Sequence, residues 1–185
     1  MAATVAALVS FTASVQAVPI TGSITFAGGV NLNTTSSGTA TAVTAWTGPG
    51  GIGNPFVIFS TLSAGAVAPV TPVTFAAPPW NFISGPVAAF WSVGGYVFNL
   101  TSSSIFSQGG SPASVTVTGA GILTKAGFDA TVGTWSFSSQ DPSSGSPANF
   151  SFSAATGAVP DGGTTVLLLG AALSGLCLFR KKMLA

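Results

Sequence analysis

Trp135-Ser136-Phe137-Ser138 is the stretch that decides the fold of this chain, because large aromatic and small polar residues alternate along it one by one. An alternation of this kind places the aromatic side chains on one face of a β-strand and the serines on the other. The same rhythm recurs at Phe150-Ser151-Phe152-Ser153, at Ser23-Ile24-Thr25-Phe26 and from Tyr96 to Thr101. The pattern predicts several half-buried strands packed around one aromatic core.

Outside these stretches, the body from Ile20 to Ala158 shows no helical periodicity, and its short apolar runs are separated by Gly, Pro, Asn and Ser. Phe56-Val57-Ile58-Phe59 is continuously apolar and is predicted to be a central strand. Gly119 and Gly121 interrupt an alternating run and predict a bulge or bend. We expect an all-β fold, an antiparallel β-sandwich or jelly-roll of about eight to ten strands.

The composition limits the chemistry that this body can perform. The chain has 185 residues, only 4% of them charged, with no His and a single Cys, Cys177. It also lacks Glu, so Ser-His-Asp and Cys-His catalysis and His- or Cys-based zinc sites are excluded. No intramolecular disulfide can form. We read Cys177 as a small apolar helix residue, with lipidation or pairing between chains as the alternatives.

Two carboxylates and one amine remain as candidates for a hydrolase. Asp129 and Asp141 could form a glycosidase pair if the fold brought them within about 5–10 Å of each other. Both lie beside turn residues, so a structural role in Asx-type turns is favoured. A Ser-Lys arrangement with Lys125 has no sequence context that supports it. We therefore predict no catalytic residue, no metal site, no cofactor and no enzymatic activity.

Binding partners are restricted in the same way. Apart from Lys125, the basic residues stand together at Arg180-Lys181-Lys182, so no basic patch exists for nucleic acid. Four tryptophans could form sugar-stacking platforms or fill the core, and the core is favoured; they are Trp46, Trp80, Trp91 and Trp135. Trp80, between Pro79 and Asn81, is the best candidate for an exposed sugar contact.

The N-terminal segment carries the features of an export signal. Residues 2 to 15 are apolar or small, and Val15-Gln16-Ala17 has small residues at the positions that signal peptidase requires. Cleavage there would leave Val18 as the first mature residue. No basic residue precedes the apolar run, so the alternatives are an atypical signal, a start further upstream or a buried helix. We predict that residues 1–17 are a signal peptide and that residues 18–158 form the exported domain.

The C-terminal segment has three parts, in the order of a short motif, an apolar run and a basic end. Val159-Pro160-Asp161-Gly162-Gly163 resists regular structure because of its proline and paired glycines. The run from Thr164 to Phe179 would make a transmembrane helix of about 24 Å, slightly short of a hydrocarbon core of roughly 30 Å. Arg180-Lys181-Lys182 would remain on the cytoplasmic side and place the body on the opposite side.

This three-part tail, residues 159–185, resembles the PEP-CTERM class of sorting signals in its VPDSG-CTERM variant, with Gly162 in place of the usual Ser. The resemblance implies a Gram-negative bacterium and an exosortase that recognises Val159 to Gly163 and processes the tail. It also implies that the body is anchored in the inner membrane during export, on the periplasmic side, and then passes to the cell surface or extracellular matrix. Sortase substrates have a similar layout but a Leu-Pro-x-Thr-Gly motif, which this chain lacks. The stretch from Gly127 to Gln140 resembles a segment of uncharacterised β-rich proteins with such tails.

Together these features favour an exported, non-enzymatic surface or extracellular-matrix protein that is processed at its C-terminal sorting signal. Its expected partners are the exosortase and the membrane. The alternative is a carbohydrate-binding β-sandwich associated with exopolysaccharide, and exposed tryptophans close to one another would favour it.

Overall fold

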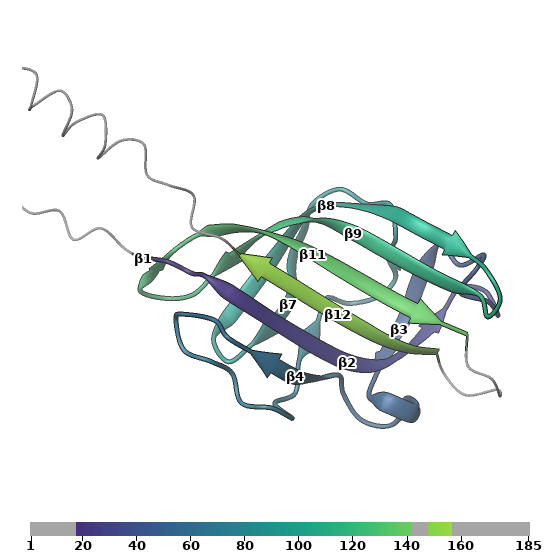
Figure 1. Cartoon of the computed structure of the whole chain (residues 1–185), viewed down its shortest axis with the longest axis horizontal. Helices are drawn as coiled ribbons and strands as arrows, with labels where there is room; N and C mark the ends of the chain where they lie inside the picture. The colour runs from purple at the N-terminus through teal and green to yellow at the C-terminus, as the bar shows by residue number, and fades with distance from the viewer. Residues whose placement is uncertain (1–17, 142–147, 157–185) are drawn as a thin grey trace, which may run out of the picture.

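The computed structural model describes residues 18–141 and 148–156 (Figure 1). The predicted signal peptide, the sorting tail and residues 142–147 lie outside the described residues. Within that part of the chain, no helix is long and apolar enough to cross a membrane. The predicted transmembrane helix, Thr164 to Phe179, falls outside it.

The body is built almost entirely of β-strands, most of them in one ten-stranded antiparallel sheet. In sheet order the path runs through β5 (Thr74–Phe75), β7 (Val87–Val93), β8 (Tyr96–Gly109), β9 (Ser114–Thr124), β11 (Thr131–Gln140), β12 (Ala148–Thr156), β2 (Gly22–Leu32), β3 (Ala42–Thr47) and β6 (Trp80–Asn81). A tenth strand, β4 (Phe56–Ser60), pairs with β2. Two short strands form a separate parallel pair, β1 (Val18–Pro19) and β10 (Phe128–Asp129), and a 3₁₀ turn spans Pro49–Gly51. The prediction of an all-β, antiparallel fold is confirmed.

The sheet is mainly a meander in which neighbours in sequence are neighbours in space. From β7 to β12 each long strand pairs with the next long strand, and β12 then pairs with β2 near the start of the body. Thr156, the last residue of β12, lies opposite Gly22, the first residue of β2. Both ends of the described body therefore lie at one end of the molecule, where β12 ends beside the start of β2 (Figure 1).

One continuous sheet supplies both layers of the fold. Phe26 of β2 contacts Trp91 of β7 with ring centroids 4.9 Å apart, although four strands separate them in the sheet. Trp46 of β3 stacks on Phe75 of β5 at 4.2 Å. The sheet thus curls over its aromatic face, and this differs from the two separate sheets expected of a sandwich. Bulges and the natural twist of the strands supply such curvature.

The alternation noted in the sequence sets the register of the central strands. Phe137 of β11 pairs with Val117 of β9, and both are fully buried, whereas Ser136 and Ser138 lie on the outer face. The bulge expected at Gly119 and Gly121 lies on the partner strand, β8, opposite those glycines. A Cβ at Gly121 would collide with the ring of Phe98, so glycine is required there by close packing.

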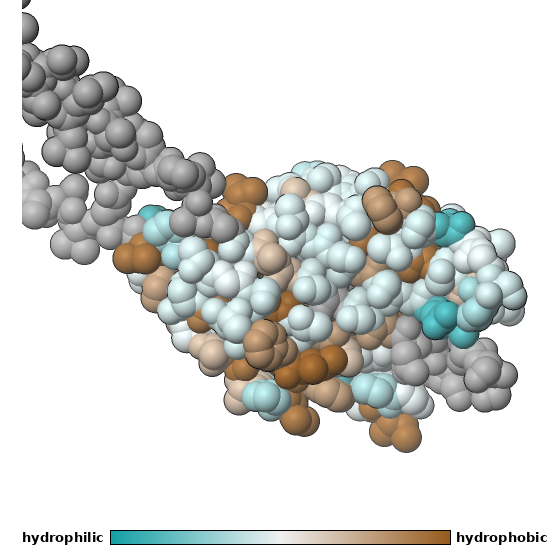
Figure 2. All heavy atoms as spheres, viewed as in Figure 1, coloured by the Kyte–Doolittle hydropathy of each residue, from teal (hydrophilic) through white to brown (hydrophobic). Residues whose placement is uncertain are grey.

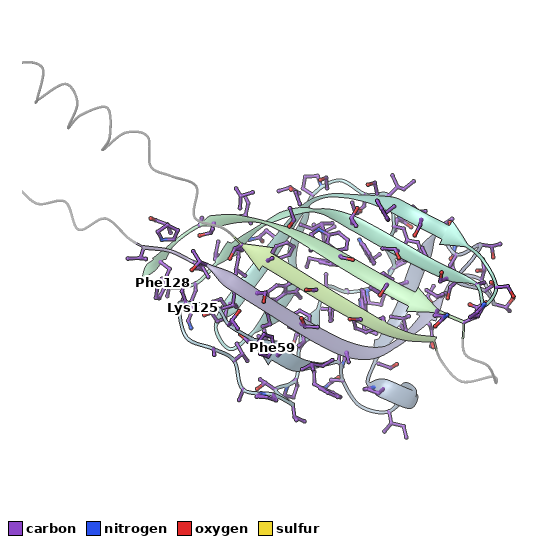
Figure 3. All side chains as sticks on the ribbon, in the orientation of Figure 1. Phe59, Lys125 and Phe128 are labelled. Atoms are coloured by element: carbon purple, nitrogen blue, oxygen red, sulfur yellow. The ribbon has the colours of Figure 1, made fainter. Side chains whose placement is uncertain are left out.

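The Phe56–Phe59 run is a strand, but the prediction that it is central is wrong. β4 pairs with β2 along one edge only, and a loop covers the other, with Val57 N–H bonded to Thr71 O at 3.0 Å. A register shift opposite Thr25 and Phe26 inserts Ile58 as an extra residue. Val57 is buried, but Phe59 then points outward beside Thr25 and is 55% exposed (Figure 3). Periodicity in the sequence cannot reveal a bulge that re-aims a side chain in this way.

Candidate functional site

The tryptophans, which were the candidate sugar contacts, belong to the core. Trp91 is 0% exposed, Trp135 3% and Trp80 4%, and Trp46 is half-buried. The predicted exposure of Trp80 is therefore wrong. Trp80 and Phe82 alternate with the exposed Asn81, because β6 pairs with β3 and turns its aromatic side chains inward. The centroid of the Trp80 ring lies 5.0 Å from that of the Phe90 ring. Because the Trp80 ring is buried among other rings, it has no free face for a sugar.

A recess of about 310 Å³ opens where this aromatic core reaches the surface, and its lining includes Trp46, Phe75, Asn54 and Thr74. Trp46 stacks on Phe75 with the ring planes 16° apart and on Trp80 at 5.9 Å and 24°. These neighbours cover the Trp46 ring, so the recess presents ring edges rather than a flat stacking platform. It is best described as the open margin of the core.

The two body carboxylates do not form a pair. Asp129 ends β10, before β11 begins, and Asp141 follows the last residue of β11, so they lie at opposite ends of this ten-residue strand. At about 3.3 Å per residue the separation is roughly 30 Å, far beyond the span of a glycosidase pair. Among the described residues, no group of three or more His, Cys, Asp or Glu could hold a metal ion.

Asp141 has a structural role, but it does not form the local Asx-type turn that was expected, because its hydrogen-bond partners lie in a loop distant in the sequence. Its carboxylate accepts hydrogen bonds from the Ser37 backbone N–H and from the Ser36 hydroxyl, the latter at 2.7 Å. These bonds hold the pKa of the Asp141 carboxyl below its ordinary value, because they stabilise the ionised form. Gln108 donates to Ser37 O at 2.9 Å and so fixes the same loop from β8.

Lys125 is likewise engaged in holding the fold. Its Nζ donates to Ala64 O at 2.7 Å and lies 4.1 Å from the centroid of the Tyr96 ring. Tyr96 in turn donates its hydroxyl proton to Gly65 O at 2.7 Å, and burial raises the pKa of this phenol. The amine and the phenol together fasten the loop after β4 to the adjoining ends of β8 and β9. Lys125 is labelled in Figure 3. No serine contacts this amine in the described structure, so the Ser-Lys arrangement is not assembled.

The feature that sequence reasoning missed is the outer face of the sheet. Hydroxyl-bearing residues on five strands are direct cross-strand partners and form one row: Ser104, Thr118, Ser136, Ser153 and Thr25. A second row runs parallel to it through Ser107, Thr116, Ser138 and Ser151. We call these nine residues the hydroxyl face. Figure 2 shows a largely pale surface of intermediate hydropathy over this part of the sheet, with brown apolar groups toward its margins.

An exposed phenylalanine stands at each margin of the hydroxyl face. Phe59 of β4 is the cross-strand partner of Thr25 and therefore extends the first row. Phe106 of β8 is 76% exposed and lies at a register shift between Ile105, which packs against the core, and Ser107. The alternating serines were visible in the sequence, but their alignment into rows depends on the register of five strands.

The sequence-predicted sorting residues, Val159 to Gly163 and Arg180 to Lys182, lie outside the described residues, as does Cys177. Comparison with protein families matches residues 158–183 to the VPDSG-CTERM motif. No curated protein and no solved structure matches the chain. The chain thus carries a PEP-CTERM-like sorting tail, which marks an exported, membrane-transiting protein and implies processing by an exosortase-type system.

Proposed function

We propose that this protein is a non-enzymatic component of the cell surface or extracellular matrix of a Gram-negative bacterium. In this proposal an exosortase processes its C-terminal tail after export. The observation that carries it is the match of residues 158–183 to the VPDSG-CTERM motif. The apolar run and basic end would hold the body at the periplasmic side of the inner membrane until the tail is processed.

The position of the two ends of the described body supports anchoring through the tail. Thr156 of β12 lies opposite Gly22 of β2, so the start and the end of the described domain are neighbours in space. Because both ends of the body lie at the same end of the molecule, the remaining surface is free to face away from the membrane (Figure 1).

The non-enzymatic part of the proposal is supported by the chemistry of the described side chains. Asp129 and Asp141 lie at opposite ends of β11, and the Lys125 amine is bound to a carbonyl and a ring. The chain has no His or Glu, and its described part has no further carboxylate or amine side chain that could act as a general base.

Intact-mass measurement of the mature protein, in cells with and without the exosortase, tests this function. With the enzyme present, we expect the purified body to lack Arg180 to Ala185, and without it we expect these residues to be retained. Asp161→Ala should block processing because it alters the motif. Asp129→Ala is the matched control, since it removes an exposed aspartate from the body, and it should be processed normally. A mass that retains Arg180 to Ala185 in both strains would contradict the proposal.

A further inference from the structure

We propose that the hydroxyl face, together with Phe59 and Phe106, binds a neutral polysaccharide chain. The proposal adds a partner to the exported body inferred above and presumes that the body reaches an extracellular glycan. The face crosses five strands and β4 continues it, so Phe59 and Phe106 are separated by about 24 Å along the sheet. This length suits an extended polymer better than a small molecule.

The hydroxyls of this face are not used by the fold. Ser136, Ser138, Thr116 and Thr118 have no hydrogen bond from their side chains to any other described group. Elsewhere in the body some hydroxyls do pair with each other, as Ser84 and Ser103 do at 2.9 Å. Each free hydroxyl can donate one hydrogen bond and accept others, which matches the mixed donor and acceptor groups of a sugar. The sheet fixes the backbone positions of these residues, so little conformational entropy is lost when a ligand binds.

The charge of the face selects among the classes of partner. None of the strands β2, β4, β8, β9, β11 and β12 contains a Lys, Arg, Asp or Glu. Phosphates, acidic glycans and anionic lipid headgroups are held chiefly by Lys and Arg, so they are disfavoured. The core of a protein–protein interface is rich in aromatic residues, Met and Arg and poor in Ser. A neutral polymer that carries hydroxyl groups is the partner whose chemistry fits this face.

The two phenylalanines supply the apolar contacts that such a polymer needs. Both rings are exposed, and in β4 a bulge is responsible, because strict alternation would have left Phe59 on the buried side with Val57. Exposing so large an apolar group sacrifices burial, and bulges are features that re-aim side chains near functional sites. The C–H groups of a sugar ring pack well on the face of an aromatic ring, and neither exposed phenylalanine has another ring stacked on it.

A pull-down with immobilised dextran, mannan and cellulose, and with alginate as the acidic comparison, tests the proposal. The full-length protein is kept in detergent micelles, so the measurement does not depend on tail processing. We expect the wild type to bind at least one neutral glycan. Ser136→Glu, which places a charge in the middle of the face, should weaken binding at least about tenfold. Phe59→Ala should weaken it roughly fivefold.

Two controls keep the result interpretable. Ile83→Ala removes a large apolar side chain that is 72% exposed and lies outside the hydroxyl face, and it should leave binding unchanged. Thermal unfolding confirms that each variant is folded, and Thr116→Glu replaces Ser136→Glu if the latter is not. The proposal is overturned if the wild type binds no neutral glycan, if it prefers alginate, or if the glutamate variant binds normally. It is also overturned if the wild type forms dimers that Ser136→Glu abolishes and no glycan binds, because the face would then join two copies of the chain.

Discussion

Replacement of Trp80 distinguishes a core tryptophan from a surface contact. Its ring is 4% exposed and lies among Phe82, Phe90 and Phe137, so Trp80→Ala should leave a large cavity. Loss of a buried tryptophan costs about 3–5 kcal/mol of the free energy of unfolding. For a domain of this size that corresponds to a fall in melting temperature of about 10–15 °C. Urea unfolding followed by far-UV circular dichroism measures the change in the full-length protein.

A second variant makes this test more specific. Trp80 Nε1 is buried and has no hydrogen-bond partner among the described residues, so the fold bears the cost of an unpaired N–H. Trp80→Phe removes that N–H and keeps most of the apolar ring, and we expect stability within about 1.5 kcal/mol of the wild type. A surface contact would behave differently, because Trp80→Ala would change stability by less than about 0.5 kcal/mol. An alanine variant as stable as the wild type would therefore refute the core assignment.

Three further substitutions test other parts of the fold. Gly121→Ala should destabilise the body by about 2 kcal/mol or more, because its Cβ would meet the Phe98 ring. Gly85→Ala is the control, since a Cβ at Gly85 has no atom within 4 Å. Equal melting temperatures of the two variants would contradict this packing. The folded state lowers the pKa of Asp141, so this residue stabilises the body fully above the ordinary carboxyl pKa of 3.8. That stability is lost as the pH falls through the lowered pKa of the folded state. Asp141→Asn should therefore flatten the acid limb of a plot of stability against pH. An unchanged acid limb would exclude this linkage. Lys125→Met should lower the free energy of unfolding by about 1 kcal/mol, because the hydrogen bond to the Ala64 carbonyl and the contact with the Tyr96 ring are lost. The loss should persist at high salt, since the amine is partly buried. If the loss disappears at high salt, the contact is only a surface attraction.

The sequence could predict those strands whose alternation is unbroken. Trp135 and Phe137 are buried where expected, as are Tyr96, Phe98 and Leu100, because a period of two fixes which face enters the core. The prediction failed where the register shifts. An extra residue in β4 turns Phe59 outward, and only pairing with β2, which is distant in sequence, determines that position. Local pattern carries no information about such long-range register.

The sorting tail could be predicted from the sequence, whereas the hydroxyl face could not. The sorting tail is encoded within one short contiguous segment, so it could be recognised from the sequence alone. The hydroxyl face is assembled from strands far apart in the chain, and Ser153 meets Thr25 only because the last strand pairs with β2. The context of Trp80, next to prolines and an asparagine, suggested exposure, but pairing with Val43 of β3 buries it.

The edges of the main sheet are short or covered at several places, which limits pairing between copies of the chain. The described residues include one Lys and two Asp, so charge repulsion does little to prevent association. An open strand edge would then invite pairing between chains. The path ends instead in two-residue strands, β5 and β6, and a loop covers the free edge of β4 through Val57 and Thr71. The part of β8 beyond Ser103 has no strand on its outer side, and it carries Phe106 at the margin of the hydroxyl face. In the proposal, the partner contacts the neutral hydroxyl face and this adjoining edge, so the low charge of the body and its proposed partner follow from the same composition.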